Sequence, residues 1–274
     1  MSDAFLCGYT LNGDGSGTPV EEDGLRRLGA ETPPVWIHLS AHAPAAIQWL
    51  EDDASLPDDT LIQALLAEDT RPRLLSRDGG VLLILRGVNL NQNAEPEDMV
   101  SIRIWAEPQR LISVQLRDLR GVAEMRQHLE SGSGPIDIGD LIATFVEGSI
   151  ARMSPVMRDL ADSIDEMEDR TLSAQLHGLR EEIVSMRRKT VIFNRFLAPQ
   201  QDIVQRLSQT ELAPLDPNQR SRLLEAHNDI ARFVEDLQAL RERSHAVQDD
   251  IANMLSERLN RNTYVFSIIA AIFI

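Results

Sequence analysis

The sequence is short of cysteine and of positive charge, and both shortages narrow the classes of protein to which it can belong. Cys7 is the only cysteine, which excludes a disulfide framework and a zinc site built from cysteine thiolates. The formal net charge is −16 at pH 7, and so acidic a chain is not suited to binding nucleic acid or an anionic membrane surface. The charge balance instead favours cations or basic partners.

The sequence also lacks the short motifs of common enzyme chemistry. The glycine-rich stretch NGDGSGT (residues 12–18) has neither the lysine nor the following helix of a phosphate-binding loop. There is no nucleophile elbow and no helical His-Glu-x-x-His. We therefore predict that the chain is not an enzyme. Its N-terminus has no basic segment and no long apolar segment, so we expect no signal peptide and a cytoplasmic start.

The chain has 274 residues, enough for about two domains. Its first half contains short apolar runs separated by turn signals. Leucine-rich and β-branched runs predict strands, and apolar residues at helical spacing predict two short helices. Residues 99–107 alternate apolar and polar side chains, which is typical of an antiparallel strand with one face in water. Residues 1–135 are thus predicted to form an α/β domain with a mixed or antiparallel sheet. The predicted strands are 35–40, 79–91, 98–108 and 110–116, and the predicted helices are 45–56 and 58–69.

Strand signals end at the glycine-rich linker ESGSGPIDIGD (residues 130–140), and only helical periodicity follows. We expect one helix over 140–169 with a kink at Pro155, and another over 173–212 interrupted at Pro199. Neither glycine nor proline occurs after Pro217, so a single helix over 217–274 is predicted, with Asp216 as its N-cap. The predicted parts are an α/β domain (1–135), a helical hairpin region (136–215), a long stalk helix (216–262) and a short apolar segment (263–274).

The last predicted helix carries a heptad repeat. Nine of its ten core positions are apolar, so this face is expected to pack on other helices as a long coiled-coil stalk. The ten positions are Leu223, Ala226, Ile230, Phe233, Leu237, Leu240, Ser244, Val247, Ile251 and Met254.

The face opposite the heptad is polar, and we call it the polar stripe. From Asp249 onward it includes Asp249, Asn253, Ser256, Asn260, Thr263, Ser267 and Ile274. A polar outer face is normal for a coiled coil. Between Asn253 and Ser267, however, the stripe holds only small neutral polar residues, and it continues into the apolar end of the chain. If several copies surround an axis, the stripe would line a pore, with Glu235, Glu242 and Asp249 attracting cations to its mouth.

The last eleven residues, Tyr264 to Ile274, are mostly apolar. They are too few to cross a bilayer, which takes about 20 residues. Either they form a buried terminal helix, or they are the start of a membrane span. Polar groups such as Thr263 and Ser267 are costly at membrane depth unless they face water or another helix.

Two further groups of residues are candidates for cation binding. His245 and Asp249 lie four residues apart on one helix face and could bind zinc, although an exposed histidine near a carboxylate is the commoner reason for this spacing. Residues 159–170 contain six carboxylates, among them Asp165, Glu166 and Asp169. These either gather cations or simply form a solvated helix face.

Two stretches carry a resemblance to a known family. Residues 67–105, with the segments TRPR, LRGVNLN and EDMVSIRIW, resemble the ZntB zinc transporters. Residues 257–273, ERLNRNTYVFSIIAAIF, are similar to the entry into the first membrane helix of the CorA superfamily of divalent-cation transporters. The Gly-x-Asn motif of that superfamily is absent and would lie beyond Ile274. The resemblance therefore implies a cytoplasmic funnel of a pentameric transporter, ending inside the first membrane helix.

The resemblance also implies a location and a substrate. The whole protein would be a homopentamer in the bacterial inner membrane, with this part cytoplasmic, no bound cofactor and Zn²⁺ as the transported ion. The family's pore positions fall on Asp249, Asn260, Thr263, Phe266 and Ile274. Four of them belong to the polar stripe, and Phe266 lies one helical step aside. Thr263 stands where magnesium-type relatives often have a bulky apolar gate.

Two alternatives stay open at this point. The transported ion could be magnesium, cobalt or nickel, because hydrated ions pass a wide pore with little discrimination. In a different class, the chain could be a soluble coiled-coil interaction protein without transport activity, with its apolar end docked on a partner.

Overall fold

The computed structural model describes residues 5–21, 33–52, 56, 58–77, 79–211 and 213–273. The chain divides into two compact units, and each is described by itself. The first unit combines residues 1–156 with 195–233, and the second combines 157–194 with 234–274. The long helices therefore contribute residues to both units.

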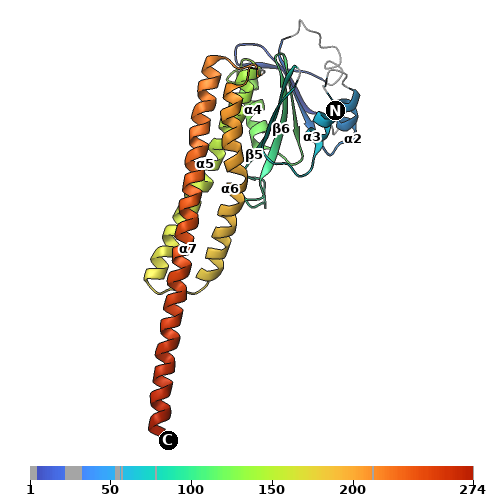
Figure 1. Cartoon of the computed structure of the whole chain (residues 1–274). Coiled ribbons are helices and arrows are strands. Elements are labelled where there is room, and N and C mark those ends of the chain that lie inside the picture. The colour runs from blue at the N-terminus through green and yellow to red at the C-terminus, as the bar shows by residue number, and fades with distance from the viewer. Residues whose placement is uncertain are drawn as a thin grey trace. The chain divides into compact units, whose positions relative to one another are not determined.

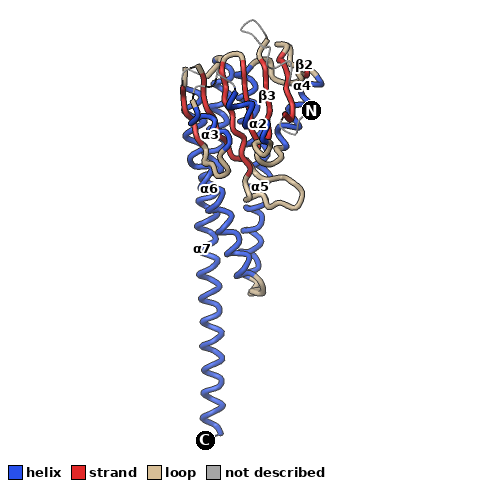
Figure 2. Tube along the Cα trace, turned by 90° about the vertical axis from the view of Figure 1, so that its right-hand side faces the viewer, coloured by secondary structure: helices blue, strands red, loops and turns tan. Residues whose placement is uncertain are grey.

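A seven-stranded sheet forms the centre of the first unit (Figure 2). Its order is β2-β1-β3-β7-β6-β5-β4, and β3 and β7 run parallel while the other neighbours are antiparallel. This confirms the predicted mixed sheet. The strands are β1 (Phe5–Leu11), β2 (Gly17–Pro19), β3 (Val35–Ser40), β4 (Arg73–Arg77), β5 (Gly80–Gly87), β6 (Val100–Glu107) and β7 (Arg110–Gln115).

One face of the sheet is covered by the two short helices predicted from the sequence, α2 (Pro44–Asp52) and α3 (Asp59–Leu66). They bury Leu50, Leu61 and Leu65 in a core that includes Trp105. Asp58 caps α3, because its Oδ1 accepts a hydrogen bond from the Leu61 amide at 2.8 Å. Apolar residues at helical spacing are enough to fix both helices on this face.

The opposite face packs against α4 (Arg120–Ser131) and the first part of α5 (Ile138–Leu172). Phe145 of α5 meets Trp36 of β3 edge to face, with ring centroids 5.6 Å apart. On α4, Val122, Met125 and Leu129 are buried, and the Glu130 carboxylate accepts a hydrogen bond from the Tyr9 hydroxyl of β1 at 2.7 Å. Both faces of the sheet are thus covered.

This double cover corrects the prediction for residues 99–107. They form β6 between two antiparallel neighbours, as expected, but neither face of the strand is in water. Ser101 is only 8% exposed and Arg103 is wholly buried. The alternation of polar and apolar residues reflects polar side chains accommodated in the core, not a solvated face.

The three long helices are α5, α6 (Leu179–Gln209) and α7 (Pro217–Phe273) (Figure 1). The predicted interruption at Pro199 is wrong, since α6 continues through it, and α5 likewise continues through Pro155 as one helix. The predicted cap of α7 is confirmed. The Asp216 carboxylate accepts from the Gln219 amide at 2.7 Å, and the Gln219 side chain accepts from the Asp216 amide at 2.9 Å.

The heptad of α7 is confirmed as its packing face. Nine of the ten predicted core positions are buried, and Met254 is partly exposed. Even Ser244 is wholly buried, where its hydroxyl donates to the carbonyl of Leu240 at 2.7 Å. The boundaries predicted for the four parts of the chain stay a prediction.

Candidate functional site

The polar stripe lies on an exposed face of α7 in the second unit. Every member with a described side chain is exposed; beyond Met254 the other faces of α7 are exposed as well, as far as Ile272. These members are Asp249, Asn253, Ser256, Asn260, Thr263 and Ser267. Ile274 lies outside the described residues. The stripe is therefore available to water, to an ion or to another chain.

The two hydroxyls of the stripe are held by their own helix. The Thr263 hydroxyl donates to the carbonyl of Leu259 at 2.9 Å, and the Ser267 hydroxyl donates to the carbonyl of Thr263 at 2.8 Å. Each hydroxyl has one proton and two lone pairs, so this arrangement uses the proton and leaves the oxygen as an acceptor. Both oxygens can therefore face a cation or a water molecule without a competing proton.

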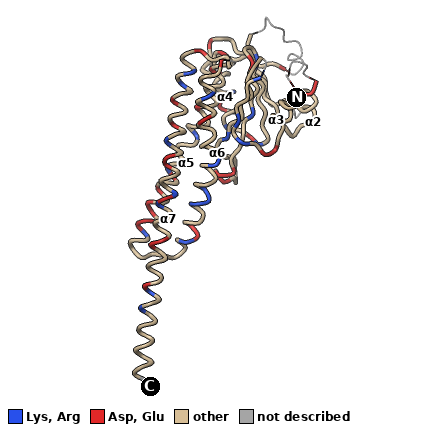
Figure 3. Tube along the Cα trace, viewed as in Figure 1, with Lys and Arg blue, Asp and Glu red and all other residues tan. Residues whose placement is uncertain are grey.

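The last turns of α7 expose apolar side chains beside the stripe. Phe266 is 71% exposed, Tyr264 is 69% exposed and Ile272 is 73% exposed. No charged residue follows Arg261, and the end of α7 is accordingly drawn in tan, without blue or red, in Figure 3. An exposed apolar surface of this kind marks a site of contact with another protein or with lipid. Within the described part of the chain, no helix combines the length and apolarity that crossing a membrane requires.

The acidic segment of α5 is partly neutralised within the second unit. Arg243 of α7 forms two hydrogen bonds to the Glu168 carboxylate, at 2.7 and 2.6 Å, and one to Asp165 at 2.5 Å. These bonds, Glu168 first, raise the pKa of the Arg243 guanidinium. Asp165 is thus less available to a cation than predicted, while Glu166 and Asp169 are exposed.

The acidic residues upstream on α7 are open to solvent, and their role in attracting cations stays a prediction. Glu235 and Glu242 are exposed. His245 is also exposed, on the same helix as Asp249. Among the described residues no group of three or more histidine, cysteine, aspartate or glutamate side chains is arranged to hold a metal ion. A metal site at His245 and Asp249 therefore stays a prediction.

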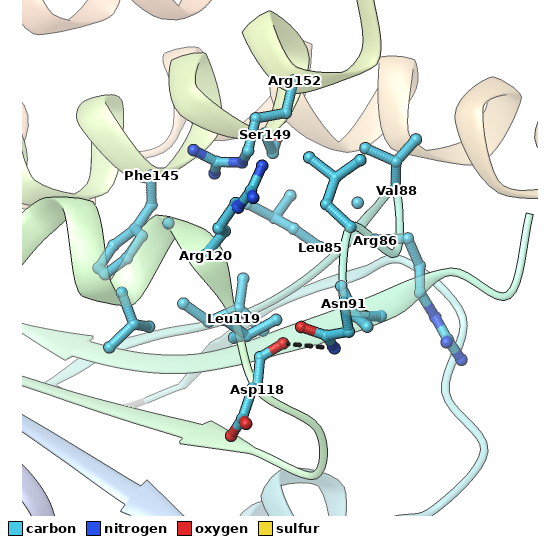
Figure 4. A pocket seen from close by; sticks show the side chains of 16 residues that line it. Leu85, Arg86, Val88, Asn91, Asp118, Leu119, Arg120, Phe145, Ser149 and Arg152 are labelled. Atoms are coloured by element: carbon cyan, nitrogen blue, oxygen red, sulfur yellow. Dashed lines mark hydrogen bonds between the residues drawn. The ribbon is translucent and has the colours of Figure 1, made fainter. Parts of the chain in front are cut away.

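Sequence reasoning missed a pocket of about 50 Å³ in the first unit (Figure 4). It lies where β5 and β6 meet the first turn of α4 and the first half of α5. Arg120 and Arg152 line it together with apolar side chains. The helix α4 was not predicted, so nothing in the sequence brought these two arginines together.

Comparison with known proteins identifies the family to which this chain is similar. Residues 32–274 match the family described as CorA-like Mg²⁺ transporter protein. The divalent cation transporter CmaX of Pseudomonas aeruginosa is 35% identical over 277 residues, which cover 98% of this chain and 82% of CmaX. The zinc transport protein ZntB of Pectobacterium atrosepticum is 31% identical, over 97% of this chain and 80% of its own length.

Solved structures agree with the sequence relatives. The structure of the full-length CmaX protein matches all of this chain and 84% of its own chain, with a TM-score of 0.92 and 33% identity. The ZntB cytoplasmic domain of Vibrio parahaemolyticus matches 94% of this chain, with a TM-score of 0.81 and 25% identity. As the resemblance predicted, the chain therefore belongs to the CorA family of transporter proteins and not to a family of enzymes.

Proposed function

We propose that this chain is the cytoplasmic, cation-gathering part of a divalent-cation transporter, and that the polar stripe of α7 lines the path of the ion. The observation that carries the proposal is the run of small neutral polar side chains from Asn253 to Ser267, all exposed, which continues along α7 the face opposite the buried heptad. A helix that served only as a coiled-coil stalk would need no such run of small neutral side chains.

The side chains along α7 would act on a cation in two stages, first by attracting it and then by coordinating it. Exposed carboxylates at Glu235, Glu242 and Asp249 raise the local concentration of cations by long-range attraction. Beyond them, amide and hydroxyl oxygens at Asn260 and Thr263 can take the place of water around the ion without a full charge that would trap it. Weak and successive contacts of this kind allow an ion to enter and to leave.

A single stripe cannot enclose a path, so the proposal includes several copies around an axis. We propose the homopentamer that the resemblance implies, in the bacterial inner membrane. The exposed apolar residues beside the stripe, such as Phe266 and Ile272, would then face neighbouring helices and lipid. The predicted role of residues 263–274 as the start of a membrane helix is part of this proposal.

Zinc is the proposed cation because zinc transport proteins are among the relatives. Magnesium is a second candidate, and the composition of the stripe favours it. All the polar groups from Asp249 to Ser267 on the stripe present oxygen atoms or amides, which suit hard cations, whereas zinc sites usually include histidine or cysteine.

The experiment is a flux measurement on the full-length protein in liposomes, with a zinc-sensitive or magnesium-sensitive dye inside. Asn260→Leu should lower the flux severalfold, because an apolar side chain replaces an oxygen ligand on the stripe. Asn262→Leu is the matched control, since Asn262 is exposed on the same helix but lies off the stripe. Equal flux in the two variants would show that the stripe does not line the path of the ion. No flux of either cation above empty vesicles would refute transport.

A further inference from the structure

The pocket of the first unit has an apolar floor and a cationic side. The floor is made by the end of β5, β6 and α4, with Val88, Ile102 and Leu119 among its residues. Phe145 of α5 closes one end. Arg120 of α4 and Arg152 of α5 point toward the same part of the pocket (Figure 4). Neither belongs to the polar stripe of α7.

Arg152 is fixed in its position by close packing. A side-chain carbon at Gly121 would lie 2.4 Å from its Nη2, and one at Gly148 would lie 3.1 Å from its Nη1. Its only partner among the described residues is the Glu124 carboxylate, 2.6 Å from Nη1. Burial, more than the attraction of Glu124, governs this group and lowers the pKa of Arg152. Two glycines therefore make room for a guanidinium that is largely removed from water.

Arg120 has no hydrogen-bond or ion-pair partner within the described part of the chain. Asp118 also lines the pocket, but its carboxylate points away from both arginines (Figure 4). That carboxylate accepts a hydrogen bond from the Gln115 side chain at 3.2 Å. Two guanidinium groups thus converge on one side of the pocket, and the single carboxylate of Glu124 balances only one of them.

We propose that this pocket binds a small organic monocarboxylate, with its carboxylate between Arg120 and Arg152 and its apolar body on the floor. The paired donors of a guanidinium match the two oxygens of a carboxylate. The apolar floor favours a ligand with a short hydrocarbon body over a fully solvated inorganic anion. A pocket of about 50 Å³ limits that body to a few carbon atoms. The site is separate from the proposed ion path and does not depend on it.

Butyrate is the probe, added to the 274-residue chain and followed by NMR chemical shifts. We expect a dissociation constant on the order of 1 mM, as befits a ligand of a few atoms. Arg120→Gln should weaken binding roughly tenfold, because it removes a charged hydrogen-bond donor. Arg117→Gln is the matched control, since Arg117 is an exposed arginine nearby that does not line the pocket. Equal loss in both variants would show a general charge effect and overturn the site.

Glu124→Gln provides a second and opposite readout. Glu124 competes for Arg152, so its neutralisation should tighten butyrate binding, about threefold or more. Misfolding would not produce tighter binding. Unchanged or weaker binding in this variant would contradict the proposal. Inorganic phosphate should bind more weakly than butyrate, and phosphate binding as tight as that of butyrate would overturn the assignment to a monocarboxylate.

Discussion

At the scale of single residues, His38 is a wholly buried histidine in the middle of the sheet. Its Nδ1 lies 2.7 Å from the Ser113 hydroxyl, and its Nε2 lies 3.0 Å from Oε1 of Gln115. The Ser113 hydroxyl also accepts a hydrogen bond from the Trp36 indole at 2.8 Å. Burial lowers the pKa of His38 from 6.5 to about 4, so the imidazole is neutral in the folded protein at pH 7.

This depressed pKa predicts that acid destabilises the protein through His38. Between 6.5 and about 4, the unfolded chain binds a proton that the folded protein does not. The free energy of unfolding should therefore fall as pH falls through this window, by up to about 3 kcal/mol from this group. Urea denaturation from pH 7.5 to 4.5 measures it. His38→Gln should flatten the profile, while the exposed His42→Gln control should keep it. The same slope in both variants would rule out His38 as the cause.

Arg103 is a second buried residue with an unusual environment. Its Nη2 donates to the carbonyl of Ala67 at 2.6 Å, but its Nε and Nη1 have no acceptor among the residues that the structure describes. Burial and the nearby charge of Arg86 lower the pKa of Arg103 to about 10. A charged group with two unpaired donors is costly in a core.

Replacing Arg103 with an apolar side chain of similar length should therefore stabilise the protein. For Arg103→Met we expect the free energy of unfolding to rise by about 1 kcal/mol, since the lost hydrogen bond is outweighed by the charge no longer buried. Thermal denaturation measures the effect. Arg73→Met on the edge strand β4 is the control, because Arg73 is exposed and should tolerate the change. A clear loss of stability in Arg103→Met alone would show that the guanidinium holds the core together.

At the scale of elements, one arginine forms ion pairs between two long helices, α5 and α7, within the second unit. Arg243 of α7 binds both Asp165 and Glu168 of α5. All three side chains are more than a third exposed, so water and salt weaken the interaction. We expect Arg243→Gln to lower the free energy of unfolding by about 1 kcal/mol at low salt and by less at high salt.

Arg241→Gln is the matched control for this change, because Arg241 is an exposed arginine on the same helix. Denaturation at two salt concentrations distinguishes the variants. Arg243→Gln also releases two carboxylates, so it should raise the affinity of the chain for Mg²⁺, measured by calorimetry. A variant as stable as the control at low salt would show that the ion pairs contribute nothing.

Periodicity explains which elements could be predicted. The helix α7 was predicted almost to its ends because its heptad repeats over many turns and no glycine or proline interrupts it. The strands β2 and β4 were missed because they are short, and the helix α4 because it is weakly apolar. The strand β1 is mostly apolar and buried, and its signal was overlooked. Pro199 was expected to interrupt α6, but neighbours that bury Leu197 and Gln200 hold the helix together.

Periodicity also explains which candidate sites could be predicted from the sequence and which could not. The polar stripe follows from spacing along one helix, so the sequence was enough to predict it. The pair of Arg243 and Glu168 joins residues 75 positions apart, and the pocket of Arg120 and Arg152 depends on four elements, β5, β6, α4 and α5, meeting in space. Contacts of this kind depend on how elements pack, which residue spacing along one segment does not encode.

At the scale of the whole molecule, a net charge of −16 is combined with an exposed apolar surface at the end of α7. The two properties act in opposite directions at a lipid surface. Burial of apolar side chains such as Phe266 and Ile272 favours binding, whereas the negative charge is repelled by anionic headgroups. The composition of the membrane should therefore control how strongly the chain binds.

We accordingly expect the chain to bind neutral phosphatidylcholine vesicles more tightly than vesicles with anionic lipid, by about threefold or more at low salt. A higher salt concentration should reduce the difference in affinity between the two kinds of vesicle, because screening weakens the repulsion between the chain and anionic headgroups and leaves the apolar contact. Vesicle co-sedimentation measures both effects. Phe266→Ser with Ile272→Ser should abolish binding to either vesicle, while Leu224→Ser, at an exposed leucine elsewhere on α7, should not. Tighter binding to anionic vesicles would show that local basic residues, and not the net charge, govern the contact.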